Sequence, residues 1–501
     1  MLSRERRRFA DYLSRRRGLF ALCALLCCVC YAHNAFSLNV RVDCEGFINE
    51  PGTLQGWMYI GRFGQAVLKP LLGNLRYNPY YSGLLFIAFF SFGAFLWCYL
   101  FHSADDSGGG REWIFAALYV TAHTWLYMFY FQMMAAEVAL GILLVPVSLR
   151  AVCRVCEEGD WKLLSFLLAV ALMVLAISTY QAITAMYITG AAACLLLRLR
   201  KNPQTSFARF VREGLAFVAP FVAALLVYRL IDKLVRQGNA GYLTQMIRWG
   251  VWKPGECLRA VLEYMGETIA GSEVYLPSFG VGLVALTAAL AVSRQKGAPV
   301  WIAALVTVLS PFFMALLLGD RMMERMQFSL PLASAFLLYY ASGSFGERFR
   351  GVLRLAVTLA AAVLCVASCA RGMRLIYTDD VRYQQDLAMS ERIYQDIEDA
   401  CGGEDYDCTV FLGRWDAPLN EACHRSNVFG ASLFGWDYSP IDQAQNSDRS
   451  WGFIQATLGL GGEKAKRAQQ ERAKALAEGM PAYPEDGYIR RAEGMVIVRL
   501  S

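Results

Sequence analysis

Residues 18–38, GLFALCALLCCVCYAHNAFSL, contain no Asp, Glu, Lys or Arg, and this stretch decides the kind of fold that the chain can adopt. About 20 apolar residues in a helix cross a bilayer, so the stretch is long enough to span a membrane. It is too long for the core of a signal peptide and no convincing cleavage site follows it, so we predict an uncleaved first span. Arginines crowd the residues before it: Arg4, Arg6, Arg7, Arg8, Arg15, Arg16 and Arg17. The positive-inside rule therefore places the N-terminus in the cytoplasm.

The rest of the chain repeats this apolar pattern. Its 501 residues are 56% hydrophobic and the mean hydropathy is +0.34, which is too apolar for a soluble protein of this length. We predict an α-helical polytopic membrane protein with 11 transmembrane helices. The ten spans after the first lie near 81–101, 112–130, 134–152, 162–180, 183–199, 213–233, 276–293, 299–318, 327–343 and 352–371.

The distribution of charge supports one orientation in the membrane. The chain has 48 Lys and Arg against 42 Asp and Glu, and residues 372–501 hold 14 against 21, or −7, which leaves 34 against 21, or +13, for the rest. Most of this excess falls in loops predicted to be cytoplasmic, whereas the outer connections around Gln132 and Gln181 have no Lys or Arg. The excess therefore sets topology, and no nucleic-acid-binding surface is predicted. We expect a multi-pass protein of the cell (inner) membrane, with the N-terminus cytoplasmic and the C-terminus outside.

The first outer loop, residues 39–80, carries the candidate catalytic groups. It begins NVRVDCEGFINEPGTLQGWMYIGRFG (39–64), with Asp43 and Glu45 two residues apart and Trp57 and Arg62 further on. A carboxylate can take a proton from a hydroxyl, and a guanidinium can grip a phosphate with two hydrogen bonds. Such groups beside a membrane suit chemistry on a lipid-linked phosphate. The alternative for the acid pair alone is a polar loop before a helix that starts near Pro51.

The second half of this loop predicts a helix that lies along the membrane surface. Arg62, Lys69 and Arg76 recur every seven residues, which places them on one stripe of a helix over 57–76, opposite an apolar face. Pro70 and Gly73 predict that this helix breaks before its end.

Two further outer segments hold candidate residues. The turn GDRMMERM contains Arg321 and Arg325 between two spans, where they bind an anionic ligand or pair with Asp320 and Glu324. Glu137 opens the span at 134–152 close to the outer surface. Its side chain either faces a cavity or reaches up to the aqueous surface. In the second case, the dipole at the helix N-terminus stabilises its negative charge.

The apolar runs stop at Arg371, and residues 372–501 predict a small extracytoplasmic α+β domain. We expect a helix over 378–400, a strand at 409–413, a charged helix at 463–480 and two short strands within 487–500. Cys401 and Cys408 bracket a turn-like segment and could pair in an oxidising compartment. Cys153 and Cys156 form an isolated C-x-x-C, which is a weak metal or redox signal.

The order of these features resembles a known family. An acid pair, Asp43-Cys44-Glu45, precedes a W-x-x-x-G-R motif that ends at Arg62; the span at 162–180 ends in Ser-Thr-Tyr180-Gln181; and MPAYPEDGYI and MVIVRL lie near the C-terminus. This pattern is similar to the serotype-converting glucosyltransferases (glucosyl transferase type II), among the polyprenyl-phosphate-sugar glycosyltransferases of the GT-C fold. The resemblance implies a GT-C-like transmembrane domain over 1–371.

The resemblance also implies a reaction: transfer of a sugar, here glucose, from a polyprenyl phosphate to a cell-envelope polysaccharide or lipid-linked glycan, with inversion. The motifs of the resemblance, together with the outer-side residues described above, give candidate residues of three kinds. The catalytic acids are Asp43, Glu45 and Glu137; the donor phosphate meets Arg62, Arg321 and Arg325; the substrate cavity includes Trp57, Tyr180 and Gln181. Cys44 separates the acids, which leaves the base open, and we favour Asp43, with Glu45 orienting the acceptor. No cofactor is predicted with certainty, although the acid pair could hold a divalent metal.

Other functions share parts of this pattern. A flippase or transporter of lipid-linked sugars has many spans but more often carries ionisable residues in mid-span, whereas His33, His123 and Glu137 lie near span ends. A glycan polymerase or ligase would place its arginines in large outer loops, as 234–275 could. A sensor should have few spans and a dominant outer domain.

Overall fold

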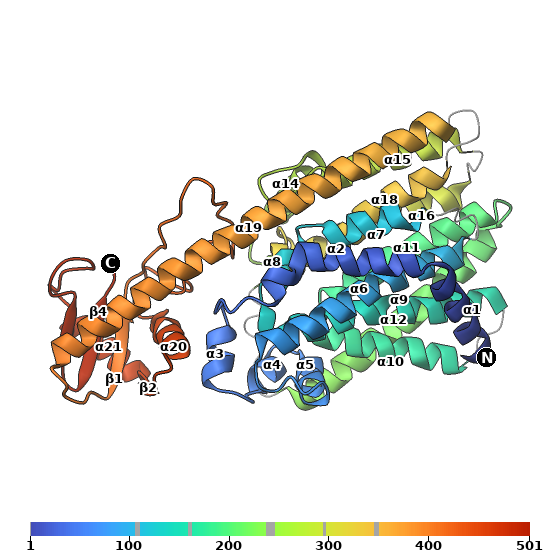
Figure 1. Cartoon of the computed structure of the whole chain (residues 1–501). Helices are drawn as coiled ribbons and strands as arrows, with labels where there is room; N and C mark the ends of the chain where they lie inside the picture. The colour runs from blue at the N-terminus through green and yellow to red at the C-terminus, as the bar shows by residue number, and fades with distance from the viewer. Residues whose placement is uncertain (1, 106–110, 159–162, 237–245, 294–296, 345–349) are drawn as a thin grey trace.

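The computed structural model describes residues 2–105, 111–158, 163–236, 246–293, 297–344 and 350–501. They form a helical bundle and, at one end of it, a small region with a sheet (Figure 1). The N-terminus lies at the opposite end of the bundle from that region.

Most of the bundle consists of apolar helices. Its main helices are α2 (Arg17–Ala35), α6 (Pro79–Ala104), α9 (Gln132–Glu158), α10 (Leu163–Thr179), α11 (Ile183–Lys201), α12 (Phe207–Val235), α15 (Ser278–Val292), α16 (Ala298–Leu309), α18 (Ser329–Ser344) and α19 (Arg350–Cys401). Further helices complete it: α1 (Leu2–Arg15), α7 (Glu112–Thr121), α8 (Trp125–Phe129), α14 (Pro254–Ala270), α17 (Phe313–Leu318) and the 3₁₀ turns Ser310–Phe312 and Glu324–Met326.

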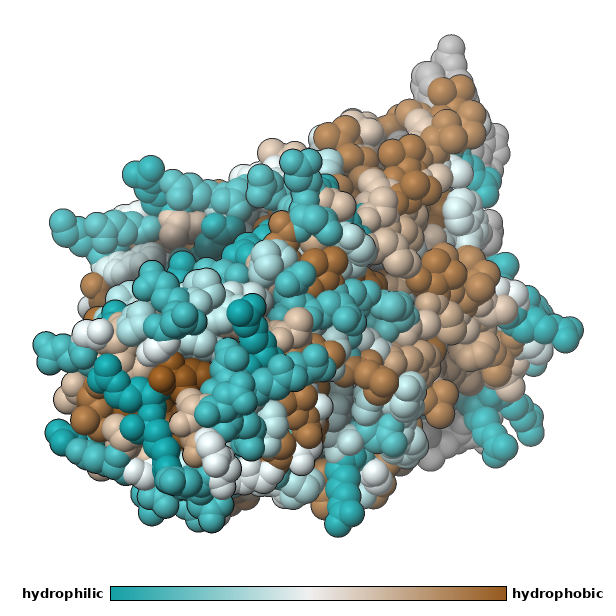
Figure 2. Space-filling view, turned by 60° about the vertical axis from the view of Figure 1, so that its left-hand side comes forward, coloured by the Kyte–Doolittle hydropathy of each residue, from teal (hydrophilic) through white to brown (hydrophobic). Residues whose placement is uncertain are grey.

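The helices agree with a multi-pass membrane protein. Among the described residues, 7 helices are long and apolar enough to cross a membrane, and α7, α10 and α15 are shorter apolar helices. Figure 2 shows hydrophobic side chains between two hydrophilic ends of the molecule. The predicted spans all coincide with helix, although the segment 112–130 is interrupted after Thr121 and the segment 299–318 after Leu309. That all 11 cross a membrane, and in which orientation, stays a prediction.

The predicted surface helix is two helices, and one of its cations points inward. α4 (Gln55–Tyr59) and α5 (Phe63–Leu71) are separated at Gly61, and α5 ends just after Pro70. Val67 and Leu71 are exposed, as a face toward lipid requires, but Lys69 is buried. The prediction that Arg62, Lys69 and Arg76 share one stripe of a helix over 57–76 was therefore wrong, because the helix is divided and Lys69 forms a buried ion pair.

Helix α19 links the bundle to the C-terminal region without a break. The sequence predicts a span ending at Arg371 and a separate helix from 378, whereas the structure has one helix of 52 residues. The predicted boundary at 371/372 therefore falls within a continuous helix. Neither Gly372 nor any proline interrupts the hydrogen bonding there.

The C-terminal region contains a four-stranded mixed sheet in the order β2-β1-β4-β3. Strands β1 (Cys408–Leu412) and β4 (Met495–Arg499) are parallel, with Cys408 opposite Met495, and β3 (Ile489–Ala492) pairs antiparallel with β4. The predicted strand at 409–413 and the closing hairpin are confirmed. The charged helix is α21 (Arg467–Leu476), and the sequence missed α20 (Ser447–Leu458) and the two-residue β2 (Glu463–Lys464). Cys401 and Cys408 are free thiols, so the suggested pairing does not form.

Candidate functional site

The acid pair lies where the first outer loop meets the C-terminal region. Asp43 precedes the short helix α3 (Cys44–Asn49), whose second residue is Glu45. One residue of α20 contacts both acids: the Nη2 of Arg449 lies 3.1 Å from Asp43 Oδ1, and its Nη1 lies 2.5 Å from Glu45 Oε1. Asp437 holds the other edge of this guanidinium, with 2.9 Å between Nη2 and Oδ2. Three carboxylates thus converge on Arg449, which lies 404 residues from Glu45 and 406 from Asp43 in sequence.

The two acids differ in environment. The Asp43 side chain is 47% exposed and that of Glu45 is 8% exposed. Burial raises the pKa of Glu45 to about 7, the attraction of Arg449 opposes this rise, and the neighbouring charge of Asp43 adds to it. Asp43 also adopts φ 70°, a left-handed conformation that is uncommon for a residue other than glycine. The pair therefore offers one accessible carboxylate, Asp43, and one buried carboxyl, Glu45, whose pKa lies near neutral pH.

Further contacts dock α3 onto the C-terminal region. Asn49 donates a hydrogen bond of 2.8 Å to the carbonyl of Gly452 in α20. Glu50 lies 2.5 Å from the Nζ of Lys464 in β2. The position of the acid pair is therefore set by side chains on both sides of the contact.

A buried ion-pair network fixes the strand of chain that leads into the acid pair. Arg41 lies 2.6 Å from Asp379 of α19, and Arg382 lies 2.7 Å from Asp379 and 3.1 Å from Asp386. All four side chains are fully buried. Arg382 also donates to the carbonyl of Val40. Because each charge has a partner of opposite sign, the network holds residues 40 and 41 against α19 without leaving a buried charge uncompensated.

Arg62, Tyr180 and Gln181 lie in contact with one another. The Arg62 guanidinium lies 4.1 Å from the centre of the Tyr180 ring and its Nε lies 3.5 Å from Gln181 Oε1. Gln181 in turn donates to the carbonyl of Ile60, at 2.8 Å, and Tyr228 donates to that of Gly61, at 2.9 Å. These bonds hold the chain on the N-terminal side of Arg62.

The glycine before Arg62 is required by this packing. Gly61 has φ +73°, and a Cβ there would lie 2.8 Å from the Tyr228 hydroxyl and 2.9 Å from Asp232. Any other residue would be strained and would collide with α12. The Gly-Arg dipeptide thus allows the loop to approach α12 closely enough to place Arg62 over Tyr180.

Trp57 lies between Phe47 of α3 and Lys69, which is the ion-pair partner of Glu137. Its ring is buried, and its centre lies 6.4 Å from that of Phe47 in α3. The Nζ of Lys69 lies 5.8 Å from the centre of the Trp57 ring and 3.3 Å from Glu137 Oε1, and Asn74 donates to the same oxygen at 2.8 Å. Glu137 is fully buried and does not snorkel.

Residues on both sides of this arrangement contact the start of α9. Arg62 Nη1 lies 3.6 Å from the Met134 sulfur, while Lys69 donates to the carbonyl of Met133. Arg62 and Lys69 are therefore both held by residues at the start of α9.

Comparison with known proteins now identifies the family. The family model for the glucosyl transferase GtrII matches residues 34–341, which is more than half of the 501 residues. The chain belongs to this family. Membership makes the protein a membrane glucosyltransferase. No curated protein and no solved structure is significantly similar to the chain, so the GT-C fold type stays a prediction.

The matched range of the GtrII glucosyltransferase includes Asp43, Glu45 and Arg62 but not Arg449 or Asp437. Sequence reasoning missed both of the latter. A buried carboxylate needs a cation, so a partner for the acid pair was to be expected. Nothing in the local sequence distinguishes Arg449 from the other arginines of residues 372–501.

The two arginines of the GDRMMERM turn contact α14 and the segment just before α9. Arg321 pairs with Glu267 of α14 at 2.8 Å, with both side chains exposed, and it is Arg248 that lies 3.3 Å from Asp320. The Arg325 guanidinium lies 5.3 Å from the centre of the Phe131 ring. The alternative that Arg321 pairs with Asp320 through its side chain is thus wrong in its partner, although it is right that Arg321 forms an ion pair.

A divalent metal at the acid pair would need ligands beyond Asp43 and Glu45. In the part of the chain that the structure describes, no three His, Cys, Asp or Glu side chains converge in a way that could hold a metal ion. Arg449 takes up the space between the two carboxylates. The residues present thus fit a guanidinium better than a metal.

Proposed function

We propose that this glucosyltransferase moves glucose from a polyprenyl phosphate to a hydroxyl of a cell-envelope glycan, on the outer face of the membrane and with inversion. The observations that support this most are an accessible carboxylate, Asp43, and a partly buried guanidinium, Arg62, in the same outer loop. No carboxylate partner of Arg62 occurs among the described residues. A cation in such a position is suited to a phosphate.

Asp43 is the proposed general base. Its carboxylate is exposed and reachable by a glycan, whereas Glu45 is buried. In the proposed step, Asp43 takes the proton of the acceptor hydroxyl while the oxygen forms a bond to the anomeric carbon. The bond from that carbon to the phosphate oxygen breaks, and the lipid phosphate leaves with the electron pair and its negative charge.

The remaining groups have supporting roles in this proposal. Glu45 anchors Arg449, which orients Asp43. Arg62 stabilises the charge of the leaving phosphate, because a preorganised cation acts most strongly where charge develops. Arg321 and Arg325 are proposed to guide the donor, Trp57 to line the substrate cavity, and Glu137 to support the site through Lys69.

The test is single-turnover transfer of labelled glucose from a polyprenyl phosphate by the purified full-length protein. General-base help is worth about 10²–10⁴ in rate, so Asp43→Asn should lose roughly that much. Its matched control is Asp416→Asn, a similarly exposed acid that pairs with Arg414. Arg62→Ala should weaken donor use about tenfold or more, because it loses a charged contact to phosphate.

Two results would contradict the assignment. Absence of transfer by the wild type would favour the flippase or polymerase alternatives. If Asp43→Asn keeps full activity, Asp43 is not the base. If Glu45→Gln is inactive in the same experiment, Glu45 is the base and Asp43 has the supporting role.

A further inference from the structure

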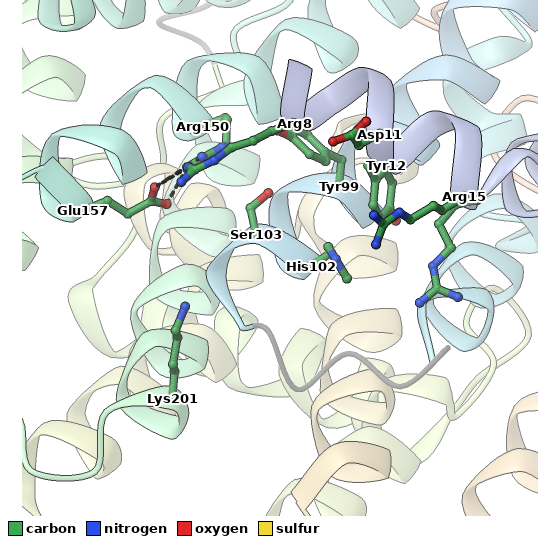
Figure 3. Close-up of a pocket in the computed structure, with 11 residues that line it drawn as sticks. Arg8, Asp11, Tyr12, Arg15, Tyr99, His102, Ser103, Arg150, Glu157 and Lys201 are labelled. Carbon is green, nitrogen blue, oxygen red and sulfur yellow. Dashed lines mark hydrogen bonds and ion pairs between the residues drawn. The ribbon is translucent and has the colours of Figure 1, made fainter. Parts of the chain in front are cut away.

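Two polar cavities in the described part of the chain differ in how their charges are paired. The larger, of about 800 Å³, lies at the end of the bundle that holds the N-terminus, between α1 and the C-terminal ends of α6, α9 and α11 (Figure 3). Its acid Glu157 already lies 3.3 Å from Arg8 and 2.7 Å from Arg150. The smaller, of about 260 Å³, lies in the C-terminal region, and most of its acids have no such partner.

This smaller space, the C-terminal cavity, lies between the end of α19, the loop before β1, α20 and the loop before β2. Five acidic side chains and one tryptophan contribute to its lining: Glu398, Glu404, Asp405, Asp407, Glu463 and Trp451. Glu404 pairs with Arg491. The other four acids form no ion pair with the residues that the structure describes. Their carboxylates are therefore available to accept hydrogen bonds from a ligand.

Trp451 adds a hydrogen-bond donor that has no partner. The residue is 3% exposed, and its Nε1 has no acceptor among the described residues. The ring edge that carries Nε1 faces Gly462 of the cavity lining, where an added Cβ would lie 3.8 Å from Nε1. Because residue 462 is glycine, no side chain of that residue separates the indole from the cavity. Buried N–H groups normally have a partner, so a free donor lies here beside free acceptors.

Hydrogen bonds hold both loops of the cavity in place. Gln455 of α20 donates to the carbonyl of Gly462 at 2.9 Å. On the other side, Arg491 donates to the carbonyl of Asp405 at 2.8 Å, and the N–H of Asp407 donates to the carbonyl of Gly494 at 2.7 Å. The lining groups are therefore positioned before a ligand arrives, which lowers the entropic cost of binding.

This combination of groups selects one class of ligand. Ionised carboxylates only accept hydrogen bonds, and an indole N–H only donates one. An amine or a metal ion would satisfy the acids but not the indole, and no three His, Cys, Asp or Glu side chains of the described residues converge on a metal position. An anion would be repelled by the acids. A sugar hydroxyl both donates and accepts, so an uncharged saccharide satisfies both kinds of group.

Helix α20 is a wall that the cavity shares with the acid pair. Trp451 lies in this helix between Arg449, which contacts both acids, and Gly452, whose carbonyl accepts a hydrogen bond from α3. Likewise, Glu463 precedes Lys464, which pairs with an acid of the first outer loop. A glycan in the C-terminal cavity therefore lies beside the segment that carries the proposed base.

We propose that the C-terminal cavity is a subsite for an uncharged sugar unit of a glycan. Asp405, Asp407 and Glu463 accept hydrogen bonds from its hydroxyls, and Trp451 donates one to them. A volume of about 260 Å³, below the roughly 300–1,000 Å³ of pockets for drug-sized ligands, suits a single sugar unit. That this glycan is the acceptor of the transferred glucose rests on the proposed function, whereas the binding of a saccharide does not.

The test measures equilibrium binding to the purified full-length protein in detergent. The probe is an uncharged oligosaccharide released from the envelope polysaccharide of cells that make the protein, and spermidine and Ca²⁺ are the competitors. We expect the oligosaccharide to bind and neither cation to displace it. Asp405→Ala/Glu463→Ala should weaken its binding about tenfold or more, because two charged hydrogen bonds are lost. Trp451→Phe keeps an aromatic ring but loses the N–H, and should weaken binding about threefold or more.

The matched control is Glu478→Ala/Glu485→Ala, which removes two exposed acids of the C-terminal region outside the cavity and should bind like the wild type. Asp43→Asn should also bind normally while it loses transfer, which separates this inference from the proposed function. Absence of transfer with normal binding would contradict the proposed function alone and leave the subsite standing. No binding by the wild type, an equal loss in the control, or displacement by spermidine or Ca²⁺ would overturn the subsite.

Discussion

Replacement of Glu45 by glutamine tests the electrostatics of the site most directly. The change removes one negative charge while it keeps the shape of the side chain. Burial raises the pKa of Glu45 from its ordinary 4.5 to about 7 even though Arg449 lies 2.5 Å away. The ionised carboxylate is therefore less stable in the folded protein than in the unfolded chain.

The size of the effect follows from this shift. Each pKa unit corresponds to about 1.4 kcal/mol, so a rise from 4.5 to about 7 amounts to roughly 3 kcal/mol. For a raised pKa, this stability is fully present below the unfolded value, near 4.5, and is lost as the pH rises through the folded value, near 7. Above pH 7 Glu45 is ionised in the wild type, and its buried charge lowers the free energy of unfolding by this full amount. The Glu45→Gln variant has no such charge and is not destabilised in this way.

The assay is thermal unfolding of both proteins in detergent at two pH values. About pH 5 lies near the ordinary pKa of 4.5, and about pH 8 lies above the folded value of about 7. We expect Glu45→Gln to unfold several degrees higher than the wild type at the upper pH and at nearly the same temperature at the lower pH. The same variant should lose part of its transferase activity, though less than Asp43→Asn does, so stability and activity move in opposite directions. Glu50→Gln is the matched control, because Glu50 forms an exposed ion pair with Lys464 and should change stability by less than about 1 kcal/mol.

Two outcomes would refute this reasoning. A lower unfolding temperature of Glu45→Gln at the upper pH would show that the ion pair with Arg449 outweighs the cost of burial. An equal shift at both pH values would show that the effect does not come from titration of Glu45.

Two further predictions concern the bundle and its orientation. Lys69→Met alone should lower the free energy of unfolding by about 3–5 kcal/mol, because it leaves Glu137 charged and buried, and adding Glu137→Gln should restore most of the loss; equal stability of the single and double variants, measured by denaturation, would show that the two residues are not coupled. A reporter active only outside the cytoplasm should be active when fused after Ser501; silence there, with activity after Ser344, would reverse the orientation.

Local sequence was sufficient for most of the helical fold. Apolar runs of sufficient length can satisfy their backbone hydrogen bonds in lipid only as helices, so each predicted span coincides with helix. Turn residues and alternating apolar residues likewise predicted β1 and the hairpin of β3 and β4. The two errors have different causes, one a tertiary contact and the other the local sequence. Lys69 is buried because Glu137 faces it, and α19 continues past Arg371 because no breaker stops it.

For the candidate site, the sequence by itself determined the kinds of groups and the loop that carries them. Asp43, Glu45 and Arg62 follow the first span closely, and a Gly-Arg dipeptide and a Tyr-Gln pair can be recognised as motifs without any coordinates. Because these residues follow the first span by only a few residues in the chain, they must lie near the membrane surface, however the rest of the chain folds.

Only the tertiary structure decided how these groups are paired and which of them are accessible. Arg449 reaches the acid pair because α19 carries the C-terminal region back over the first outer loop, where Arg41 and Asp379 fasten it. This contact buries Glu45, which raises its pKa, and leaves Asp43 exposed. The difference between the two acids is a property of the contact and not of either segment alone. Electrostatic interactions depend on distance through space and on access of water, and neither quantity is encoded in the spacing of residues along the chain.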